Sequence, residues 1–357
     1  METKRIIIKD KTDPKDNELM EAAEILKHGG LVAFPTETVY GLGANALNGE
    51  AARKIYEAKG RPSDNPLIAH IADEEGLFPL VKEIPETARK LMKAFWPGPL
   101  TMIFPKSDAV PYGTTGGLET VAVRMPSDPV ANRLIKLAGV PVAAPSANTS
   151  GRPSPTTADH VWEDMNGKIE MILDGGPVGI GVESTIVDVT GEVPMLLRPG
   201  AITMEMLTDL LGHVEIDPAI TGPMKEGVHP KAPGMKYRHY APKADMVLVE
   251  GELKAMAEEI CRLASEAGQQ GKRVGIICTE ETKSFYDGKN HENWILLCMG
   301  SREKEETIAH NLYGVLRKFD DCQADCIYCE GFPRTELGQA IMNRLTKAAG
   351  HHIIHVM

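Results

Sequence analysis

Short apolar runs alternate with stretches of helical periodicity from the start of the chain to about Gly212. A short apolar run between Gly, Pro or polar residues predicts a buried strand, whereas apolar residues spaced three and four apart predict a helix. The predicted strands are residues 31–34, 66–71, 100–104, 120–123, 140–144, 171–173, 184–189 and 195–197. The predicted helices are residues 16–28, 48–59, 85–95, 128–138 and 202–211, the first two capped by Asp16 and Asn48 and ended by Gly29 and Gly60. This alternation predicts an α/β domain with a twisted mixed sheet over residues 1–212.

The pattern changes twice after residue 212. Residues 213–245 contain five prolines and no sustained period, which predicts a linker. Apolar runs return as "MVLVEG", "RVGIIC", "WILLC" and "CIYCEG", and they alternate with helical stretches at 252–267, 303–319 and 337–349. Strands and helices that alternate in this way predict a smaller Rossmann-like α/β domain with a parallel sheet over residues 246–357.

Composition fits two domains and excludes some functions. The chain has 357 residues, more than the roughly 100 to 200 of one ordinary domain. Its formal net charge of -11 argues against a broad nucleic-acid-coating surface, because counterion release needs many clustered Lys and Arg side chains. No apolar run approaches the about 20 residues that span a bilayer, and the apolar stretch near the start is too short for a signal peptide. We expect a cytoplasmic protein, with no membrane partner, whose six cysteines are reduced.

The stretch "FPTETVYGLGANA", residues 34–46, is the first candidate for chemistry. It predicts that a strand ends in a loop rich in hydroxyl groups and glycine, and such loops often hold ligands. Its G-x-G-x-x-A spacing matches the dinucleotide pattern only weakly, because "TETVY" separates the glycines from the strand. The chain has no G-x-x-x-x-G-K-[ST] segment, so any nucleotide must be held without a P-loop.

Three other patterns favour plain structural roles. Cys322, Cys326 and Cys329 have an iron–sulfur spacing, but only 28 residues follow them, so buried strand cysteines are the favoured interpretation. The histidines in "HHIIHV" alternate faces in a predicted edge strand, and we expect no protein-held metal. A Ser-His-Asp hydrolase is disfavoured because no G-x-S-x-G elbow is present.

Cations and hydroxyl groups recur at the predicted strand ends beside Pro and Gly, where α/β proteins build ligand sites. They stand in the segments "KGRPSDNPL", "RMP", "PSANTSGRPSPT", "ESTIVD" and "LLRPG". Three or four of these cations, if they converged, would suit a triphosphate with about four negative charges.

Seven segments in this order closely resemble the YrdC family of threonylcarbamoyl-adenylate synthases: "FPTETVYGLGANA", "KGRPSDNPLIAHI", "WPGPLT", "VAVRMP", "APSANTSGRPSPT", "ESTIVD" and "LLRPG". "APGMKYRHYAP" and "AIMNRLTKAA" resemble the long, two-domain form, so the resemblance spans nearly the whole chain. It implies that L-threonine, bicarbonate and ATP give threonylcarbamoyl-AMP, pyrophosphate and water, the first step of N6-threonylcarbamoyladenosine modification of tRNA. It also implies Mg²⁺ with the ATP, separate transfer proteins that act on tRNA, and weak or no direct tRNA binding by this chain.

The resemblance assigns roles to particular residues. The implied catalytic residues are Lys59, Arg61, Ser146 and Asn148. The implied threonine contacts are Thr38, His70, Arg124, Ala144 and Ser184. The implied ATP contacts are Arg61, Asn65, Thr120, Ser146, Ser154, Arg198 and Tyr240. Arg124 would pair with the carboxylate of threonine.

Two alternatives accompany this interpretation. An RNA-binding module without nucleotidyl transfer activity is the rival function, although aromatic residues make up only 5% of the chain. Within the predicted linker 213–245, the run from Pro233 to Pro242 concentrates cations and tyrosines. We predict that this run closes over the nucleotide as a lid, and a passive tether is the alternative.

Overall fold

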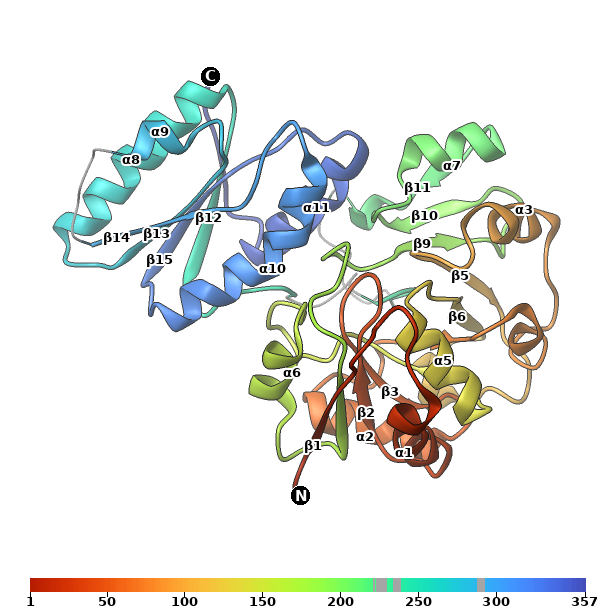
Figure 1. Cartoon of the computed structure of the whole chain (residues 1–357). Helices are drawn as coiled ribbons and strands as arrows, with labels where there is room; N and C mark the ends of the chain where they lie inside the picture. Colours follow the sequence, from red (N-terminus) through yellow and green to blue (C-terminus); the bar gives the residue numbers. More distant parts are fainter. Residues whose placement is uncertain (221, 223–229, 234–238, 288–292) are drawn as a thin grey trace. The chain divides into compact units, whose positions relative to one another are not determined.

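The computed structural model describes residues 1–220, 222, 230–233, 239–287 and 293–357, and it divides into two compact units (Figure 1). The first unit comprises Met1–Ser150 and Ser154–Tyr237, and the second comprises Gly151–Pro153 and Arg238–Met357. The division at residue 237 falls inside the segment that the sequence predicts as a linker.

The first unit is built on one mixed sheet. Its strands are β1 (Lys4–Ile7), β2 (Val32–Phe34), β3 (Gly41–Asn45), β4 (Ile68–His70), β5 (Leu100–Pro105), β6 (Thr120–Arg124), β7 (Val142–Ala143), β8 (Met171–Asp174), β9 (Thr185–Asp188), β10 (Met195–Arg198) and β11 (Glu215–Ile216). They lie in the order 1-8-2-3-7-4-6-5-9-10-11. Some neighbours, such as β4 and β6, run parallel, whereas others, such as β5 and β6, run antiparallel. The predicted mixed sheet is confirmed.

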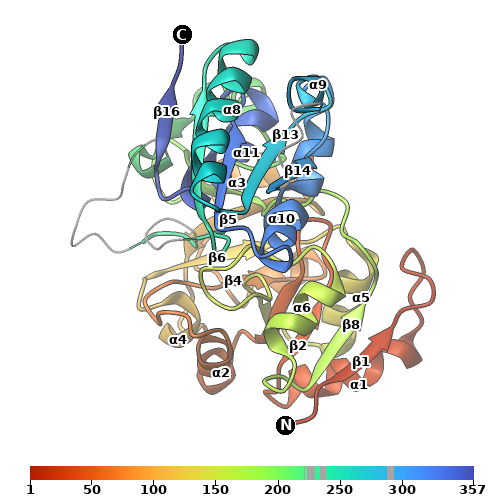
Figure 2. The ribbon, with the colours of Figure 1, turned by 90° about the vertical axis from the view of Figure 1, so that its left-hand side faces the viewer.

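Helices cover both faces of this sheet. They are α1 (Asp16–Lys27), α2 (Gly49–Lys59), α3 (Glu86–Phe95), α4 (Tyr112–Thr115), α5 (Pro129–Ala138), α6 (Ala158–Met165) and α7 (Met204–Leu211). Alternate residues of β2 point to opposite faces, so Val32 and Phe34 pack with α1 and α5 while Ala33 packs in the other core cluster. Figure 2 shows α1 and α5 side by side on their face.

Two predicted helix caps have different outcomes. Asn48 caps α2 as predicted, because its side-chain oxygen accepts hydrogen bonds from the backbone N–H groups of Glu50 and Ala51. Gly60 ends α2 with a left-handed backbone (φ 61°), a conformation that glycine adopts without steric cost. The prediction for Asp16 is wrong, since it is the first helical residue and its carboxylate accepts two hydrogen bonds from Arg133 of α5.

The predicted loop after Phe34 is shorter than expected. Residues 41–45 form β3, which pairs antiparallel with β2. A Cβ atom at Gly43 would lie 2.7 Å from Cε1 of Phe34 and 2.8 Å from Cγ1 of Val142. The glycine pattern therefore makes room for the Phe34 ring inside the sheet, which agrees with the weak match of this segment to the dinucleotide pattern.

Part of the predicted linker belongs to the sheet of the first unit. Strand β11 pairs parallel with β10, and Ala232 is buried in a cluster with Ile68, Ile103 and Leu197. The lid prediction concerns the run from Pro233 to Pro242, of which residues 234–238 lie outside the described residues, so it stays a prediction.

The second unit is a five-stranded parallel sheet, as the alternation of strands and helices predicts. Its strands are β12 (Asp245–Glu250), β13 (Val274–Cys278), β14 (Trp294–Cys298), β15 (Cys326–Glu330) and β16 (Ile353–His355), in the order 14-13-15-12-16. Its helices are α8 (Leu253–Gln269), α9 (Lys283–Tyr286), α10 (Glu305–Asp321) and α11 (Glu336–Ala348). All four strand pairings are parallel, so the Rossmann-like prediction is confirmed. Helices α8 and α9 lie on one face of the sheet and α10 and α11 on the other (Figure 1).

The cysteine prediction holds in part. Cys329 is fully buried in β15 and Cys326 is half-buried in the same strand. Cys322 instead follows the last residue of α10, so it is not a strand cysteine. The final strand is also shorter than predicted, because His351 has a left-handed backbone (φ 65°) and β16 begins only at Ile353.

Candidate active site

The first group of predicted site residues converges where α2 ends. Lys59 is the last residue of α2 and is buried. Its Nζ atom donates hydrogen bonds to the backbone carbonyl oxygens of Ser146 and Asn148. The Ser146 hydroxyl lies 2.5 Å from the side-chain oxygen of Asn148. Three of the four residues named as catalytic are therefore in direct contact, although Lys59 and Asn148 are 89 residues apart in the sequence.

Arg61 and Asn65 lie together in the loop after α2. The Arg61 guanidinium donates to the carbonyl oxygens of Asn65 and Pro66, at 3.3 and 3.0 Å. Asn65 is buried, whereas Arg61 and Thr120, the first residue of β6, are partly exposed. Partial exposure leaves the planar Arg61 fork accessible to an anionic ligand.

Arg124 is buried at the end of β6 and is held from three directions. Its Nη2 atom lies 2.7 Å from Oε1 of Glu37, its Nη1 donates to the Thr38 hydroxyl at 2.9 Å, and its Nε donates to the Gly98 carbonyl oxygen at 3.3 Å. Burial is the largest single influence on Glu37 and opposes its ionisation, but the charge of Arg124 and the hydrogen bonds to the carboxylate together outweigh burial and hold the pKa of this carboxyl below its ordinary value. Arg124 thus sits beside Thr38, as the resemblance implies, with Glu37 as an additional partner.

His70 lies next to Arg124 and is neutral. The two residues are register partners in the parallel pair β4–β6. Complete burial, followed by the charge of Arg124, lowers the pKa of His70 to about 3. Its Nδ1 atom lies 3.1 Å from the Ile68 carbonyl oxygen, which can only accept, so Nδ1 carries the proton. The backbone N–H of Ala144 donates to the same carbonyl oxygen, which places Ala144 beside this pair.

Ser184 and Arg198 form a further buried group. Arg198 of β10 donates from Nε to the Ser184 carbonyl oxygen at 3.0 Å and from Nη2 to its hydroxyl at 3.1 Å. The Ser184 hydroxyl also lies 2.8 Å from the hydroxyl of Thr101. Ser154 is tied to the same segment, since its hydroxyl donates to Glu183 at 2.5 Å.

Tyr240 is the remaining predicted ATP contact, and it belongs to the second unit. Its ring centre lies 5.4 Å from that of Tyr313, and the guanidinium carbon of Arg344 lies 5.9 Å from the Tyr240 ring. Its contact with ATP stays a prediction.

The sequence does not assign roles to Glu37, Glu183 or Thr101, which the structure adds to these groups. All three stand inside the segments that carry the resemblance, "PTETVY", "ESTIVD" and "WPGPLT". The sequence could have indicated these residues, because each is polar and stands in one of the segments that carry the resemblance. The sequence does not show which side chain each of them contacts in the folded protein.

Asp128 caps helix α5, but its buried position near Glu37 disfavours its charged form. Its carboxylate caps α5 by accepting from the backbone N–H groups of Val130 and Ala131, at 2.9 and 3.1 Å. Burial is the main cause that raises the pKa of this carboxyl to about 6, and the charge of Glu37 adds to the effect. The folded state therefore resists the ionisation that the unfolded chain undergoes near pH 4.

We expect Asp128→Asn to stabilise the protein at neutral pH. A raised carboxyl pKa costs stability that is absent below the unfolded pKa and grows as pH rises to the folded value of about 6. Asparagine caps a helix as well as aspartate does, so the variant removes the charge and keeps the cap. The free energy of unfolding should rise by about 1 to 2 kcal/mol at pH 7.5. Chemical denaturation at pH 7.5 and pH 4 measures the effect, and an equal gain at both pH values would contradict the charge explanation.

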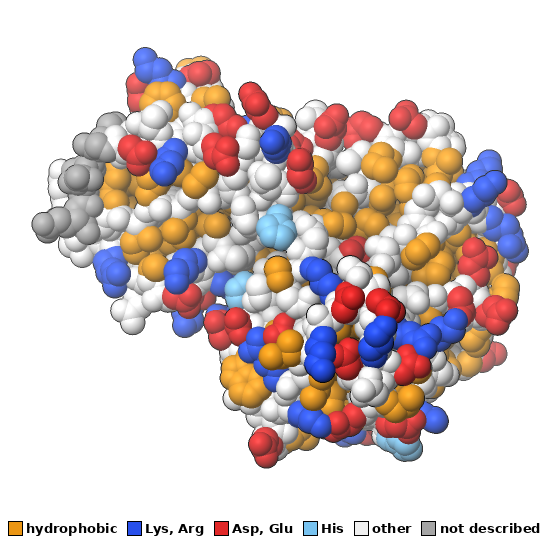
Figure 3. Space-filling model, viewed as in Figure 1, with side chains coloured by type: hydrophobic (Ala, Val, Ile, Leu, Met, Phe, Trp, Pro, Cys, Tyr) orange, Lys and Arg blue, Asp and Glu red, His pale blue; other side chains and the backbone are white. Residues whose placement is uncertain are grey.

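The charges on the visible face do not form a cationic surface. Figure 3 shows Lys and Arg side chains interspersed with Asp and Glu on that face. This mixture, together with the net charge of -11, does not favour the rival RNA-binding module. Among the described residues, no helix is both long and apolar enough to cross a membrane.

The first unit therefore carries buried cations, hydroxyl groups and a neutral imidazole at the ends of its strands. The chain also contains a second, Rossmann-like unit. This arrangement defines a class of two-domain α/β proteins with a polar small-molecule site. Comparisons with known proteins specify the class further. The family model for Sua5, YciO and YrdC, described as "Telomere recombination", matches residues 24–200. A model described as "Threonylcarbamoyl-AMP synthase, C-terminal domain" matches residues 202–350.

Individual relatives agree over nearly the full length. The chain is 50% identical to the threonylcarbamoyl-AMP synthase of Bacillus subtilis, covering 99% of this chain and 100% of that protein. It is 51% identical to the protein of the same name from Pyrococcus abyssi, over 94% of this chain and 95% of that protein. A crystal structure of Pyrococcus abyssi Sua5 complexed with L-threonine matches with a TM-score of 0.91 and 47% identity, over 99% of this chain and 100% of that one. The chain belongs to the threonylcarbamoyl-AMP synthase family, whose members are nucleotidyl-transferring enzymes.

Proposed function

We propose that the first unit binds L-threonine and ATP and, with bicarbonate, forms threonylcarbamoyl-AMP and pyrophosphate there. The main support is the group around Arg124, a buried guanidinium with Thr38 and the neutral His70 beside it. A guanidinium recognises a carboxylate, and a hydroxyl and an imidazole suit the polar groups of threonine. The crystal structure of the Pyrococcus abyssi relative, which contains L-threonine, supports the same choice of amino acid.

In this proposal Glu37 holds Arg124 in place until the substrate arrives. The carboxylate of threonine would compete with Glu37 for the Nη2 side of Arg124, which lies 2.7 Å from Glu37. Nη1 and Nε would keep their bonds to Thr38 and Gly98, so the guanidinium would stay oriented during the exchange. This exchange gives Glu37 a positioning role.

The nucleotide would lie against the remaining cations and hydroxyl groups. Arg61 and Arg198 would contact ATP, and Lys59 would add positive charge near the phosphates while it fixes the loop of Ser146 and Asn148. The neutral amine of threonine would attack bicarbonate, and loss of one bicarbonate oxygen as water would give a carbamate. A carbamate oxygen would then attack the α-phosphorus of ATP while the bond from that phosphorus to pyrophosphate breaks. These steps need orientation and charge stabilisation and no covalent enzyme nucleophile.

The proposed Mg²⁺ would accompany ATP. Among the described residues no three His, Cys, Asp or Glu side chains are grouped as a metal site requires. Mg²⁺ commonly binds through substrate phosphates and water, so we assign no protein ligands to it and derive no step through it. The product would pass to separate proteins that modify tRNA in the cytoplasm.

The test is to incubate the full chain with ATP, L-threonine, bicarbonate and Mg²⁺ and detect threonylcarbamoyl-AMP by mass spectrometry. We expect pyrophosphate release with L-valine to be roughly 10- to 100-fold slower, because valine leaves a buried partner of the threonine hydroxyl unpaired. Absence of the adenylate would contradict the proposed reaction. Equal rates with valine would contradict the polar threonine pocket alone.

A further inference from the structure

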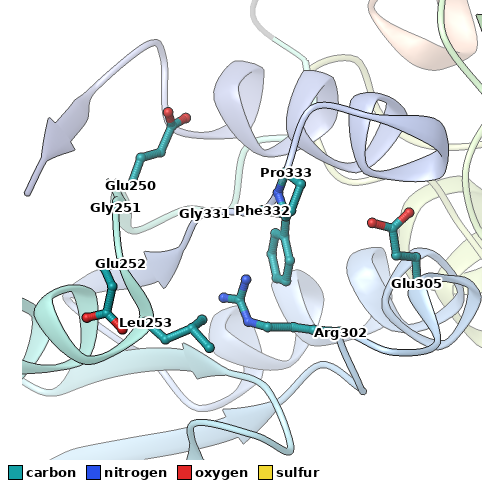
Figure 4. Close-up of a pocket in the computed structure, with 9 residues that line it drawn as sticks. All are labelled: Glu250, Gly251, Glu252, Leu253, Arg302, Glu305, Gly331, Phe332 and Pro333. Carbon is teal, nitrogen blue, oxygen red and sulfur yellow. The ribbon is translucent and has the colours of Figure 1, made fainter. Parts of the chain in front are cut away.

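The second unit contains a pocket that the proposed reaction does not use. It has a volume of about 540 Å³, and Figure 4 shows Arg302 and Phe332 between Glu252 and Glu305. Its wall includes the residues that directly follow β12 and β15, which are adjacent parallel strands. The volume lies within the range of small-molecule sites, roughly 300 to 1,000 Å³.

The pocket lies where an open parallel sheet binds ligands. In the strand order 14-13-15-12-16, the connection after β12 runs towards the β14 edge of the sheet to reach β13. The connection after β15 runs towards the opposite edge to reach β16. The connections after these neighbouring strands thus leave in opposite directions, and the crevice between them is the topological switch point. Gly251 and Gly331 stand at the two strand ends. A Cβ atom at either would collide with the neighbouring strand ends, so these glycines serve packing and the ligand chemistry depends on the side chains.

The position that phosphate occupies in many Rossmann-like proteins is already filled. The side chain of Glu252 caps α8 by accepting from the backbone N–H groups of Lys254 and Ala255, at 3.0 and 3.2 Å. These are the donors that a phosphate at the helix start would need. A carboxylate in this place repels phosphate, so the pocket does not suit a nucleotide.

Arg302 supplies the pocket with one positively charged donor of fixed orientation. Its Nε donates to the Thr279 hydroxyl at 3.2 Å and its Nη2 donates to the buried Glu330 at 2.8 Å. The Tyr286 hydroxyl donates to the other oxygen of Glu330 at 2.7 Å, and the guanidinium lies 4.5 Å from the centre of the Phe332 ring. Within the described part of the chain, Nη1 of Arg302 has no hydrogen-bond partner. This nitrogen is therefore available to a ligand acceptor.

The opposite charge lines the rest of the pocket. Glu250 pairs with Arg334 at 2.6 Å, and Glu305 accepts from the backbone N–H of Gly338 at 2.8 Å. With Glu252, three carboxylates line the wall against one lining cation, Arg302. Glu330 balances the charge of Arg302 and Arg334 balances that of Glu250, so the carboxylates of Glu252 and Glu305 leave the wall with a net negative charge. The local field therefore favours a positively charged group on the ligand. Leu253, Phe332 and Pro333 provide the apolar part of the wall.

We propose that this pocket binds a free α-amino acid with an apolar side chain. The ligand carboxylate would accept from Nη1 of Arg302, its ammonium group would lie among the glutamates, and its side chain would pack on Leu253 and Pro333. An apolar α-amino acid has a group for each part of the pocket: a carboxylate for Arg302, an ammonium group for the glutamates and a side chain for the apolar wall. A phosphate ester or a simple fatty acid lacks the ammonium group. The site is separate from the one proposed for threonine and ATP, and it does not depend on that proposal.

Isothermal titration of the full chain with three probes tests the inference. L-leucine carries both charged groups, leucinamide lacks the carboxylate, and 4-methylpentanoate lacks the ammonium group. We expect L-leucine to bind, and both analogues to bind at least about tenfold more weakly, because each loses one charge-assisted contact. No measurable binding of L-leucine at about 10 mM would overturn the inference, and so would equal binding of either analogue.

Two matched substitutions locate the binding. Leu253 and Leu210 are similarly exposed, at 37% and 38%, but only Leu253 lines the pocket. Leu253→Trp should fill the pocket and weaken L-leucine binding at least about tenfold, whereas Leu210→Trp on α7 should leave it unchanged. Thermal unfolding of both variants checks that they fold. Unchanged binding by a folded Leu253→Trp variant would overturn the inference, even if L-leucine binds elsewhere on the chain.

Discussion

Arg61→Ala should reduce threonylcarbamoyl-AMP formation by roughly 100-fold or more, because it removes a planar cation from the proposed phosphate site. The fold should survive, since Arg61 is partly exposed and its described bonds go to the backbone carbonyl oxygens of Asn65 and Pro66. Loss of such bonds costs about 1 kcal/mol of unfolding free energy. Adenylate formation by mass spectrometry and a denaturant melt on the same samples measure both quantities.

Arg53 offers a matched control on the neighbouring helix. It lies on α2 and is exposed, and it pairs with Glu50 and Glu57 of the same helix. Arg53→Ala should change activity and stability little, because exposed helical ion pairs contribute about 0.5 kcal/mol or less. Arg61→Lys should recover only part of the activity, since a single ammonium group cannot reproduce the bidentate contact of a guanidinium with phosphate. An Arg61→Ala enzyme as active as the Arg53→Ala control would remove Arg61 from the site.

The second large effect concerns Arg124 and separates its structural from its catalytic role. Arg124→Met should lower the free energy of unfolding by about 3 to 5 kcal/mol, because it leaves the Glu37 carboxylate buried without its cation. Glu37→Gln together with Arg124→Met should restore most of this stability by removing both charges. The double variant should still fail to use L-threonine, since no guanidinium remains to bind the substrate carboxylate.

Chemical denaturation and threonine-dependent pyrophosphate release on the single and double variants complete this test. Glu37→Gln alone serves as the control for the altered hydrogen-bonding group, and it keeps the guanidinium for the substrate. Threonine-dependent activity in the stable double variant would show that Arg124 does not bind the substrate carboxylate. A stable Arg124→Met single variant would instead contradict the buried ion pair.

The sequence predicts most elements of the fold because local signals mark them. Asn48 and Gly60 bound α2 by side-chain capping and by a left-handed backbone, and both effects depend on one or two residues. Strand β3 was missed because "GLGAN" lacks the β-branched and aromatic residues that mark strands, and its pairing with β2 supplies the stability. The short β11 was missed for a similar reason, since its formation depends on the neighbouring β10.

The site was predictable in its members but not in its pairings. Loop cations and hydroxyl groups identify Lys59, Ser146 and Asn148 as candidates, and the fold brings them into contact. The pairing of Arg124 with Glu37 was not predictable, because it depends on where β6 and the loop after β2 meet in space. Burial then decides the charge states, as the neutral His70 shows.

The packing of Phe34 against Gly43 restricts which residues can replace either of them in evolution. The aromatic ring occupies the space that a side chain at position 43 would need, so the two positions share one fixed volume. A larger residue at 43 is tolerable only where 34 has become small, and a lone change at either leaves a clash or a void. Aligned relatives should therefore show reciprocal residue sizes at 34 and 43, independent of the ligand that each protein binds. If Gly43 is invariant within this family, the reason would be the packing inside the antiparallel pair β2–β3.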